Sequence, residues 1–305
     1  MRICALFGVT RQAFYQHNCH QEEVNIEVLL IISEVKRIRE QHKAMGTRKL
    51  YEKLYPFMLE HQIKMGRDVL FDCLSNHKLL IRKRKRKIST TMSYHRFHKY
   101  PNLIKNKQIT ASNQLYVSDI TYWKIESGFA YISFITDVFS HKIVGYQVAE
   151  TLETIESKVA LEMALQTLSK EQMQELIHHS DRGVQYCSIE YVKLLQDNGI
   201  KISMTETSEP TDNAVAERIN GILKNEYLCF EKVENIAQAK INLKEAVKLY
   251  NQDRPHMSIG NLTPSEVHQS GIKTERLWKN YYPVSYTHLR AHETKANLVC
   301  RLLLE

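Results

Sequence analysis

Three acidic residues have the types and the sequence context of a site for divalent metal ions. Asp181, in HHSDRGVQY, and Glu217, in DNAVAERINGILKNE, are separated by 35 residues, and each lies in a cluster of polar residues. Asp119, in YVSDITYW, precedes Asp181 with 61 residues between them. Carboxylates that are brought close together repel one another unless hard cations bridge their oxygens. The trio therefore predicts two divalent ions, which would activate an attacking oxygen and stabilise a leaving one in phosphoryl displacement.

Each acid also has an ordinary structural interpretation. Asp181 could cap a loop, and Asp119 could be a charge that protects an edge strand from unwanted pairing. Asp137, in FITDVF, also falls in a predicted strand, but it lacks a flanking polar cluster. We therefore leave Asp137 out of the predicted site.

The helix predicted around Glu217 brings further polar residues to the predicted metal site. Positions three and four apart share one helical face, and its apolar residues occupy another face. The residues of the polar face are Asn213, Glu217, Asn220 and Lys224. This face is suited to DNA, with Lys224 on a phosphate. The alternative is the solvated face of an amphipathic helix.

The elements that must position these residues are typical of an α/β fold. Segments rich in β-branched and aromatic residues predict strands joined by hairpins. These segments are residues 115–125, 129–139 and 143–149. The elements predicted after them are a helix over 154–168, a strand ending at 178, a helix over 188–197, a strand over 200–204 and a helix over 212–228. The order βββαβαβα predicts a mixed five-stranded sheet with helices on both faces, on which the three acids can converge at one edge.

Basic residues are concentrated in the front part of the chain. The 305 residues carry a formal net charge of +8, but residues 1–110 contain 22 Lys and Arg against 9 Asp and Glu, a net charge of +13. The remainder has 20 against 25, or −5. A region that grips nucleic acid, attached to a region that holds cations, accounts for this division. The alternative is a basic surface that is only solvated.

The front part also has the helical pattern of a DNA-binding region. Residues 1–20 predict a turn at Gly8 and then a helix capped by Thr10, which is the back part of a helix-turn-helix; the alternative is a plain helical hairpin. Because its N-terminal side is short, we expect this element to be incomplete or completed by another chain. Residues 21–87 predict a small helical bundle with a helix over 26–42.

A run of six cations ends this helical region, and residues 88–113 then predict a linker that either lies along DNA or is a surface tether. Such a run contacts phosphates with little base specificity. Over the whole chain, the candidate DNA-contacting residues are Arg11, Gln12, Arg82, Lys83, Arg84, Lys85, Arg86, Lys87, Arg182, Asn213, Asn220 and Lys224.

Composition excludes several other classes of protein. The six cysteines form no CxxC pair and no regular spacing, so neither a zinc site nor a disulfide framework is indicated. No apolar run approaches the roughly 20 residues of a membrane span, and no signal pattern opens the chain. We therefore expect a cytoplasmic protein without a membrane partner.

Five motifs in one order carry a family resemblance. YVSDITYW, GFAYISFITDVFSHKIVGY, HHSDRGVQY, DNAVAERINGILKNE and YNQDRPHMSIGNLTPSEV closely resemble the integrase core of bacterial transposases of the insertion-sequence-three family. The resemblance covers about residues 1–282. It implies an RNase H-like catalytic core over residues 114–230 and a helical extension over residues 231–283. It also implies that Asp119, Asp181 and Glu217 are the Asp-Asp-Glu triad that binds Mg²⁺ or Mn²⁺.

The resemblance further implies a DDE-type enzyme that cuts double-stranded DNA at element ends and uses a DNA 3′-hydroxyl as the nucleophile. Such an enzyme works as a homo-oligomer in the bacterial cytoplasm, associated with the nucleoid, and a separate upstream helix-turn-helix polypeptide is a further candidate partner. Two alternatives stay open. One is a DNA-binding repressor without catalysis, and the other is an RNase H-type nuclease acting on RNA–DNA hybrids.

The sequence departs from the family at three places. The residues TETSEPTDNA lack the lysine-glycine pair that often precedes the last acid, and the front helix-turn-helix is short. The third departure is the segment over residues 284–305, which resembles a translated sequencing-library adapter. We expect this segment to be non-native, and resequencing of the source locus across codon 284 tests that expectation.

Overall fold

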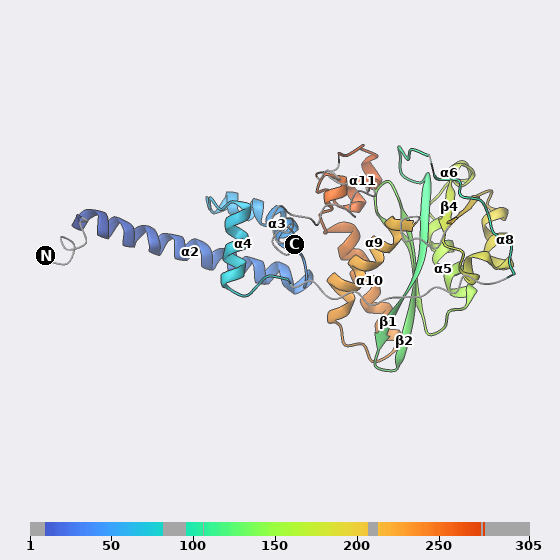
Figure 1. Ribbon diagram of the computed structural model, residues 1–305, viewed down its shortest axis with the longest axis horizontal. Helices are drawn as coiled ribbons and strands as arrows, with labels where there is room; N and C mark the ends of the chain where they lie inside the picture. The colour runs from blue at the N-terminus through green and yellow to red at the C-terminus, as the bar shows by residue number, and fades with distance from the viewer. Residues whose placement is uncertain (1–9, 82–95, 106, 207–212, 276, 278–305) are drawn as a thin grey trace, which may run out of the picture.

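The computed structural model describes residues 10–81, 96–105, 107–206, 213–275 and 277. A helical region comes first, and a core built on a β-sheet follows it (Figure 1). The predicted basic run over 82–87 and the predicted non-native segment over 284–305 lie outside the described residues.

Three helices form the helical region: α2 (Arg11–Gln41), α3 (Thr47–Glu60) and α4 (Arg67–Asn76). Helices α3 and α4 pack on the C-terminal half of α2, around buried residues such as Ile31 and Leu50, while the other half of α2 projects away from the molecule (Figure 1). The prediction of separate helices around 10–16 and over 26–42 was wrong, because α2 is continuous over 31 residues. The intervening sequence, QHNCHQEEVN, contains no Gly or Pro that would end a helix.

Five strands form one mixed sheet: β1 (Leu115–Ile125), β2 (Gly128–Asp137), β3 (Ile143–Ala149), β4 (Ile177–Ser180) and β5 (Lys201–Met204). Their order across the sheet is β3-β2-β1-β4-β5. Strands β1, β2 and β3 pair antiparallel, whereas β4 runs parallel to both β1 and β5. The predicted mixed sheet of five strands with flanking helices is confirmed. A helix-turn-helix within the helical region stays a prediction.

Helices cover both faces of the sheet (Figure 1). One face carries α5 (Thr154–Leu165), α6 (Lys170–Glu175), α7 (Val184–Cys187) and α8 (Ile189–Asp197), and the other carries α9 (Ala214–Ile222) and α10 (Ile236–Gln252). Successive residues of a strand pack on opposite faces of the sheet. Ile135 packs on the side of α5 and α8, and Phe134 packs on the side of α9 and α10. This alternation is the period of two that the strand patterns require.

Helix α5 lies close against β3 at Gly145. A Cβ added at this glycine would lie 2.1 Å from the carbonyl oxygen of Ala160 and 3.0 Å from the Cβ of Ala164. Any side chain would push the helix off the sheet, so the absence of a side chain at Gly145 sets their separation.

The helix that carries Glu217 changes geometry along its length. Helix α9 ends at Ile222, and the chain continues directly into a π-helical turn, η2 (Leu223–Tyr227), and a 3₁₀ turn, η3 (Leu228–Phe230). The predicted helix over 212–228 is therefore present from Ala214 onward, but it is not regular. Single π-helical turns within helices are rare and are frequent at functional sites.

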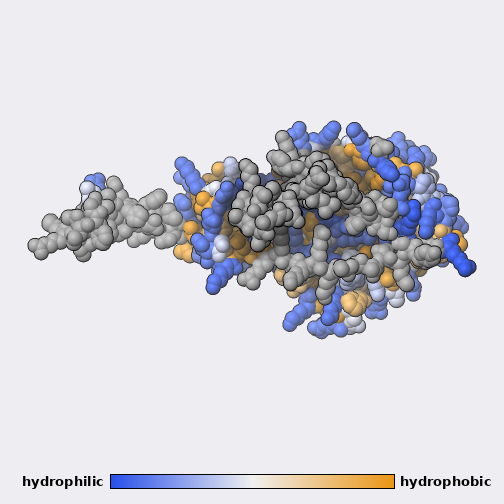
Figure 2. Space-filling view, viewed as in Figure 1, coloured by the Kyte–Doolittle hydropathy of each residue, from blue (hydrophilic) through white to orange (hydrophobic). Residues whose placement is uncertain are grey.

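The last described elements are a 3₁₀ turn, η4 (Met257–Ile259), and helix α11 (Pro264–Ser270). A capping box begins α11, because Thr263 Oγ1 accepts a hydrogen bond from Glu266 N at 3.3 Å and Glu266 Oε2 accepts one from Thr263 N at 2.7 Å. Hydrophilic residues predominate among the coloured atoms of the face in Figure 2, with hydrophobic ones in separate groups. Among the described helices, none combines the length and the apolar character that a bilayer crossing demands.

Candidate active site

Asp119 and Asp181 lie at the same level on two neighbouring parallel strands. Ser118 of β1 is in register with Ser180 of β4. Asp119 is the next residue on β1, and Asp181 is the first residue after β4. Since neighbouring strands are about 4.8 Å apart, the register alone brings these two acids together.

Glu217 approaches the two aspartates from helix α9. Ala216 and Ile219 of this helix are buried, with Ile219 in the core against the sheet, while the Glu217 side chain is exposed. Asp119 lies within the range of the Glu217 charge as well as the Asp181 charge. The fold thus gathers three acids that are far apart in the sequence.

The surroundings of Asp119 hold its carboxyl group in an unfavourable electrostatic position. Burial raises the pKa of Asp119 to about 7, and the nearby charge of Asp181, with a smaller effect of Glu217, acts in the same direction. Two hydrogen bonds oppose this effect: Ile120 N donates to Oδ1 at 2.9 Å, and Asn220 Nδ2 donates to Oδ2 at 2.6 Å. A pKa near neutrality is typical of functional carboxylates, although buried structural networks produce it too.

Two asparagines hold helix α9 against strand β1. Asn220 donates to Asp119, and Asn213 Nδ2 donates to the carbonyl oxygen of Ser118 at 3.0 Å. Both side chains are buried. Within the described part of the chain, the Oδ1 atom of each has no hydrogen-bond partner. The predicted polar helical face is therefore turned towards the protein at these two positions, and each has an acceptor atom left over.

The loop after β4 is shaped around Asp181. Gly183 N donates a hydrogen bond of 2.9 Å to Asp181 Oδ1. A Cβ at Gly183 would lie 2.9 Å from the same oxygen, so a larger residue would press on the carboxylate. Glycine at this position lets the loop fold back onto Asp181.

Lys224 places a cation next to the acids. Its Nζ lies 4.1 Å from the centroid of the Tyr122 ring. Burial lowers the pKa of Lys224, while the charge of Asp119 raises it. The ammonium group therefore lies near Asp119 on an aromatic surface, an arrangement that holds a cation where it can meet an anionic ligand.

The donor set suits a hard cation. Three carboxylates and the unpaired Oδ1 of Asn220 are oxygen ligands of the kind that Mg²⁺ prefers. Positive charge between the acids would offset the burial and the smaller repulsion that together raise the pKa of Asp119. As they stand, no three His, Cys, Asp or Glu side chains in the described part of the chain form a group tight enough to hold a metal ion.

Comparison with known proteins identifies the family. Two family models, each described as an integrase core domain, match residues 109–210 and 198–264. A protein of insertion element IS600 from Shigella sonnei, described as an uncharacterized 31 kDa protein, is 34% identical over 268 residues, which cover 86% of this chain and 96% of the relative. The transposase for insertion sequence element IS629, also from Shigella sonnei, is 32% identical over 240 residues, 78% of each chain. The chain belongs to the insertion-sequence transposases with an integrase core.

The transposase is thus an enzyme of the DDE type, and the resemblance seen in the five motifs is confirmed. Solved viral integrases also resemble it. The HTLV-2 integrase catalytic core domain in complex with magnesium has a TM-score of 0.41 and 19% identity, and the match covers 52% of this chain and 97% of that one. The simian T-cell lymphotropic virus intasome in complex with the PP2A regulatory subunit B56 gamma has a TM-score of 0.44 and 18% identity. That match covers 79% of this chain and 80% of the other chain.

A buried network that sequence reasoning missed lies behind the two aspartates of the transposase. His178 Nε2 is 2.7 Å from Ser118 Oγ and 3.0 Å from Tyr191 OH. All three side chains are buried, and they join β4, β1 and α8. Ser118 directly precedes Asp119, and His178 lies three residues before Asp181. Burial lowers the pKa of His178 to about 3, so its ring is neutral at physiological pH. The pair of histidines before Ser180 was the available signal, but histidine in a strand does not by itself indicate a structural role.

The structure also explains why Asp137 of the transposase is not in the site. Its side chain is fully buried at the turn between β2 and β3. Oδ1 accepts a hydrogen bond from Asn113 N at 2.9 Å, and Oδ2 accepts bonds from Ser140 N at 2.9 Å and Ser140 Oγ at 2.5 Å. Asp137 therefore fixes a turn.

The predicted DNA-contacting residues have different placements. Gln12 is exposed on the projecting part of α2, Arg182 follows Asp181, and the side chain of Arg11 is not among those described. Lys224 and the two asparagines surround the acids. The residues that lie outside the described part are Arg82, Lys83, Arg84, Lys85, Arg86 and Lys87.

Proposed function

We propose that the transposase cleaves double-stranded DNA at the ends of its element and joins those ends to target DNA, using Asp119, Asp181 and Glu217 as the catalytic and metal-binding triad. The observation that supports this most strongly is that burial, with the nearby charges of Asp181 and Glu217, raises the pKa of Asp119 to about 7. Carboxylates that disfavour one another's charge are suited to a cation, because the bound cation reverses that penalty.

Oxygen atoms of the three acids, with Asn220 Oδ1 beside them, would hold two Mg²⁺ or Mn²⁺ ions. When bound, such ions supply Lewis-acid activation of the attacking oxygen and charge stabilisation of the leaving one. Asn220 orients the Asp119 carboxylate through its amide, and Gly183 N orients that of Asp181. Lys224 is placed to contact a DNA phosphate next to the triad.

The joining step balances without any further reactant. The oxygen of a DNA 3′-hydroxyl attacks the phosphorus of a target phosphodiester, and a new P–O bond forms. The bond from phosphorus to the 3′ oxygen of the target strand breaks, and that oxygen leaves as a hydroxyl after taking up a proton from solvent. The proton of the nucleophile is lost to solvent. End cleavage is the same displacement with water as the nucleophile.

The test is a cleavage and strand-transfer assay on duplex oligonucleotides that carry the ends of the source element, with and without Mg²⁺. Asp119→Asn, Asp181→Asn and Glu217→Gln should each lower both activities by about 10³-fold or more, because losing a metal ligand removes several kcal/mol of charge stabilisation. DNA affinity should change little. Glu190→Gln, on the exposed side of α8, is the matched control.

Different outcomes separate this function from its alternatives. Retained activity in one variant would remove that residue from the triad. A wild-type chain that binds these ends with Mg²⁺ present but never cuts them would be a repressor. Preferential cleavage of an RNA–DNA hybrid over the duplex would indicate an RNase H-type nuclease.

The partners follow from the same proposal. Double-stranded DNA is the substrate, and the excess of cations in residues 1–110 supports its binding. Because two element ends must meet, we propose that the transposase works as a homo-oligomer, which light scattering with and without end-bearing DNA measures. A separate upstream helix-turn-helix polypeptide is the further partner to examine in the flanking DNA.

A further inference from the structure

The helical region and the core meet at a set of ion pairs. Lys49 and Lys53 lie one helical turn apart on α3, and both face the core. Lys49 Nζ is 3.0 Å from Glu226 Oε1, and Lys53 Nζ contacts the carboxylate of Asp253. Both lysine side chains are about four-fifths buried, with 19% and 20% of their surface exposed. These contacts join residues that are far apart in the sequence, in the two regions of the chain.

Arg254 of the core also pairs with Glu226, the partner of Lys49. Its Nε is 2.8 Å from Glu226 Oε2, and its NH2 group is 2.8 Å from Glu226 Oε1. The Arg254 side chain is 1% exposed. Although burial raises the pKa of Glu226, the bonds and charges of Arg254 and Lys49 outweigh it and lower that pKa to about 2. Glu226 therefore stays ionised and held on both sides.

Glu226 belongs to the helix that carries Glu217. Helix α9 continues without a break into η2, and both Leu223 and Tyr227 of η2 are buried in the core. A displacement of Glu226 would therefore also move Glu217, because a continuous helix of about two turns joins the two residues.

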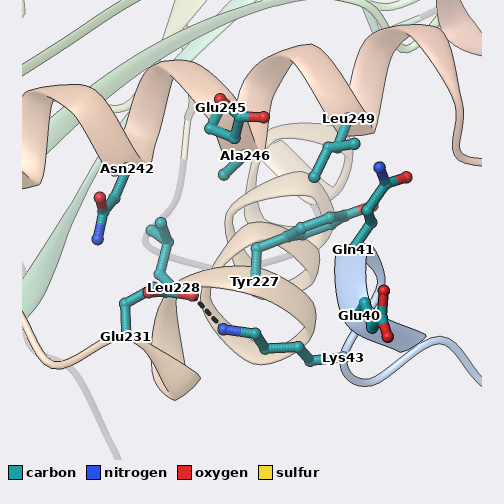
Figure 3. Close-up of a pocket in the computed structure, with 10 residues that line it drawn as sticks. All are labelled: Glu40, Gln41, Lys43, Tyr227, Leu228, Glu231, Asn242, Glu245, Ala246 and Leu249. Carbon is teal, nitrogen blue, oxygen red and sulfur yellow. Dashed lines mark hydrogen bonds and ion pairs between the residues drawn. The ribbon is translucent and has the colours of Figure 1, made fainter. Parts of the chain in front are cut away.

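A second connection runs beside the first. His42, at the end of α2, contacts Tyr227 OH through Nδ1 at 3.1 Å and Asp253 Oδ2 through Nε2 at 2.6 Å. Figure 3 shows the Tyr227 ring between Gln41 of the helical region and Leu249 of α10, at the wall of a cavity of about 220 Å³. The same view shows Lys43 paired with Glu231 at 2.5 Å. Tyr227 of η2 is therefore held by the helical region as well.

We propose that Arg254 and Lys49 are positioning residues, which act through Glu226 to hold the helix of Glu217 in one arrangement relative to the helical region. This inference rests on the proposed function. The helical region would grip DNA, and the junction would fix where the bound strand enters the triad. The junction would therefore affect both the position of the cut in the DNA and the rate of cutting. A misplacement of the DNA strand by about 1 Å costs on the order of 100-fold in rate.

Stability alone does not account for this arrangement. Burying charged groups costs free energy, and apolar residues of similar volume often replace such pairs without loss. Burial and the neighbouring Arg254 lower the pKa of Lys49 to about 8, despite its bond to Glu226. Hydrogen-bonded charged pairs fix the relative orientation of the two helices that carry them, which an apolar contact does not do.

The experiment compares Lys49→Met and Arg254→Lys with the wild-type chain. Lys49→Met keeps the aliphatic stem and leaves Glu226 paired with Arg254, so the fold is retained. Arg254→Lys keeps the charge but loses the two-bond geometry. Cleavage sites are mapped at nucleotide resolution on end-bearing duplexes, and amide hydrogen exchange of α3, α9 and η2 is measured by mass spectrometry on the same chains without DNA.

We expect both variants to lower cutting at the normal position at least tenfold, to spread the remaining cuts over neighbouring positions, and to speed exchange in η2. DNA affinity should stay within about twofold. Lys43→Met is the matched control, since its pair with Glu231 crosses the same junction at the surface, where ion pairs contribute little. The control should keep both the position and the rate of the cut.

Two results would overturn the inference. One is slower cutting at an unchanged position, which a loss of folded protein also produces. The other is unchanged exchange in α9 and η2 for Lys49→Met. If the wild-type chain makes no cut at all, the proposed function fails instead, and the exchange measurement still decides whether the junction restrains the helix.

Discussion

Asn220 donates a hydrogen bond of 2.6 Å from Nδ2 to Oδ2 of Asp119, and so joins the helix of Glu217 to the strand beside it. This bond stabilises the charged form of the carboxylate and lowers the pKa of Asp119 against the effect of burial. Asn220→Ala should therefore raise the pKa of Asp119 further. We expect cleavage at neutral pH to fall about 10- to 100-fold, with partial recovery as the pH rises.

A pH–rate profile with Mg²⁺ present checks this expectation. Asn225→Ala is the matched control, because Asn225 is exposed on η2 and donates to the carbonyl oxygen of Gly221, away from the acids. An Asn220→Ala profile that is lower at every pH by the same factor would contradict the proposed effect on Asp119.

The stability of the metal-free transposase should fall as the pH rises through neutrality. The pKa of Asp119 is about 7 in the folded chain against a usual value of 3.8, so the folded state binds a proton that the unfolded state releases. The favourable contribution is complete below about pH 4 and is lost as the pH rises through about 7. Asp119→Asn should remove this loss and stabilise the metal-free chain at pH 8 by on the order of 2–4 kcal/mol.

Thermal unfolding in EDTA between pH 5 and 8 measures the effect, and Asp197→Asn, at the exposed end of α8, is the control. Addition of Mg²⁺ should raise the Tm of the wild-type chain most at pH 8, and should raise that of Asp119→Asn much less. Equal stabilisation of the two chains by Mg²⁺ would speak against Asp119 as a ligand.

The contact between Tyr191 and His178 should affect activity through the positions of the aspartates. Tyr191→Phe removes the hydroxyl group that lies 3.0 Å from His178 Nε2 and leaves Ser118 in place. We expect a loss of about 1 kcal/mol in the free energy of unfolding and a several-fold loss of cleavage. Since His178 is already neutral at neutral pH, the shape of the pH–rate profile should stay as in the wild type. A displaced acidic limb would mean that His178 takes part in proton transfer.

Asp137 should behave in the opposite way to the triad. Asp137→Ala leaves the two buried donors of Ser140 and the half-buried backbone donor of Asn113 without their acceptor, so the free energy of unfolding should fall by about 3–5 kcal/mol. The fraction that remains folded should still gain stability from Mg²⁺ and should still cut DNA. Urea unfolding, with activity expressed per folded molecule, tests this expectation. Loss of the Mg²⁺ response in the folded fraction would place Asp137 in the site after all.

Strands β1 and β3 could be predicted to the residue because their β-branched and aromatic runs end at turns that the sequence marks clearly. The region of the three acids could be inferred too, since strand order decides which ends of strands are neighbours. Helices α6 and α7 were missed, being six and four residues long, because a pattern of that length contains less than two helical turns.

Other features depend on contacts between distant parts of the chain. The sequence pattern placed Asn220 and Lys224 on one face with Glu217, but only the packed structure shows that Asn220 is turned inward to Asp119. Likewise, YNQDRPH falls in the helical extension expected over residues 231–283, whereas the partners of Asp253 and Arg254 lie some 200 residues upstream and 28 residues upstream. The spacing of residues within one element cannot predict ion pairs between such distant segments.

The π-helical turn at Leu223–Tyr227 limits how this chain can change in length. Such a turn holds more residues than an α-helical turn, so removing one residue there would restore a regular helix. Five residues of a π-helical turn span about the same rotation as four residues of an α-helix at about 100° each, so the residues after the deletion would keep nearly the same direction relative to Glu217. Relatives that lack the π-helical turn should therefore have one residue fewer between Glu217 and Tyr227, whereas a deletion within α9 would turn Glu226 by about 100° away from Arg254.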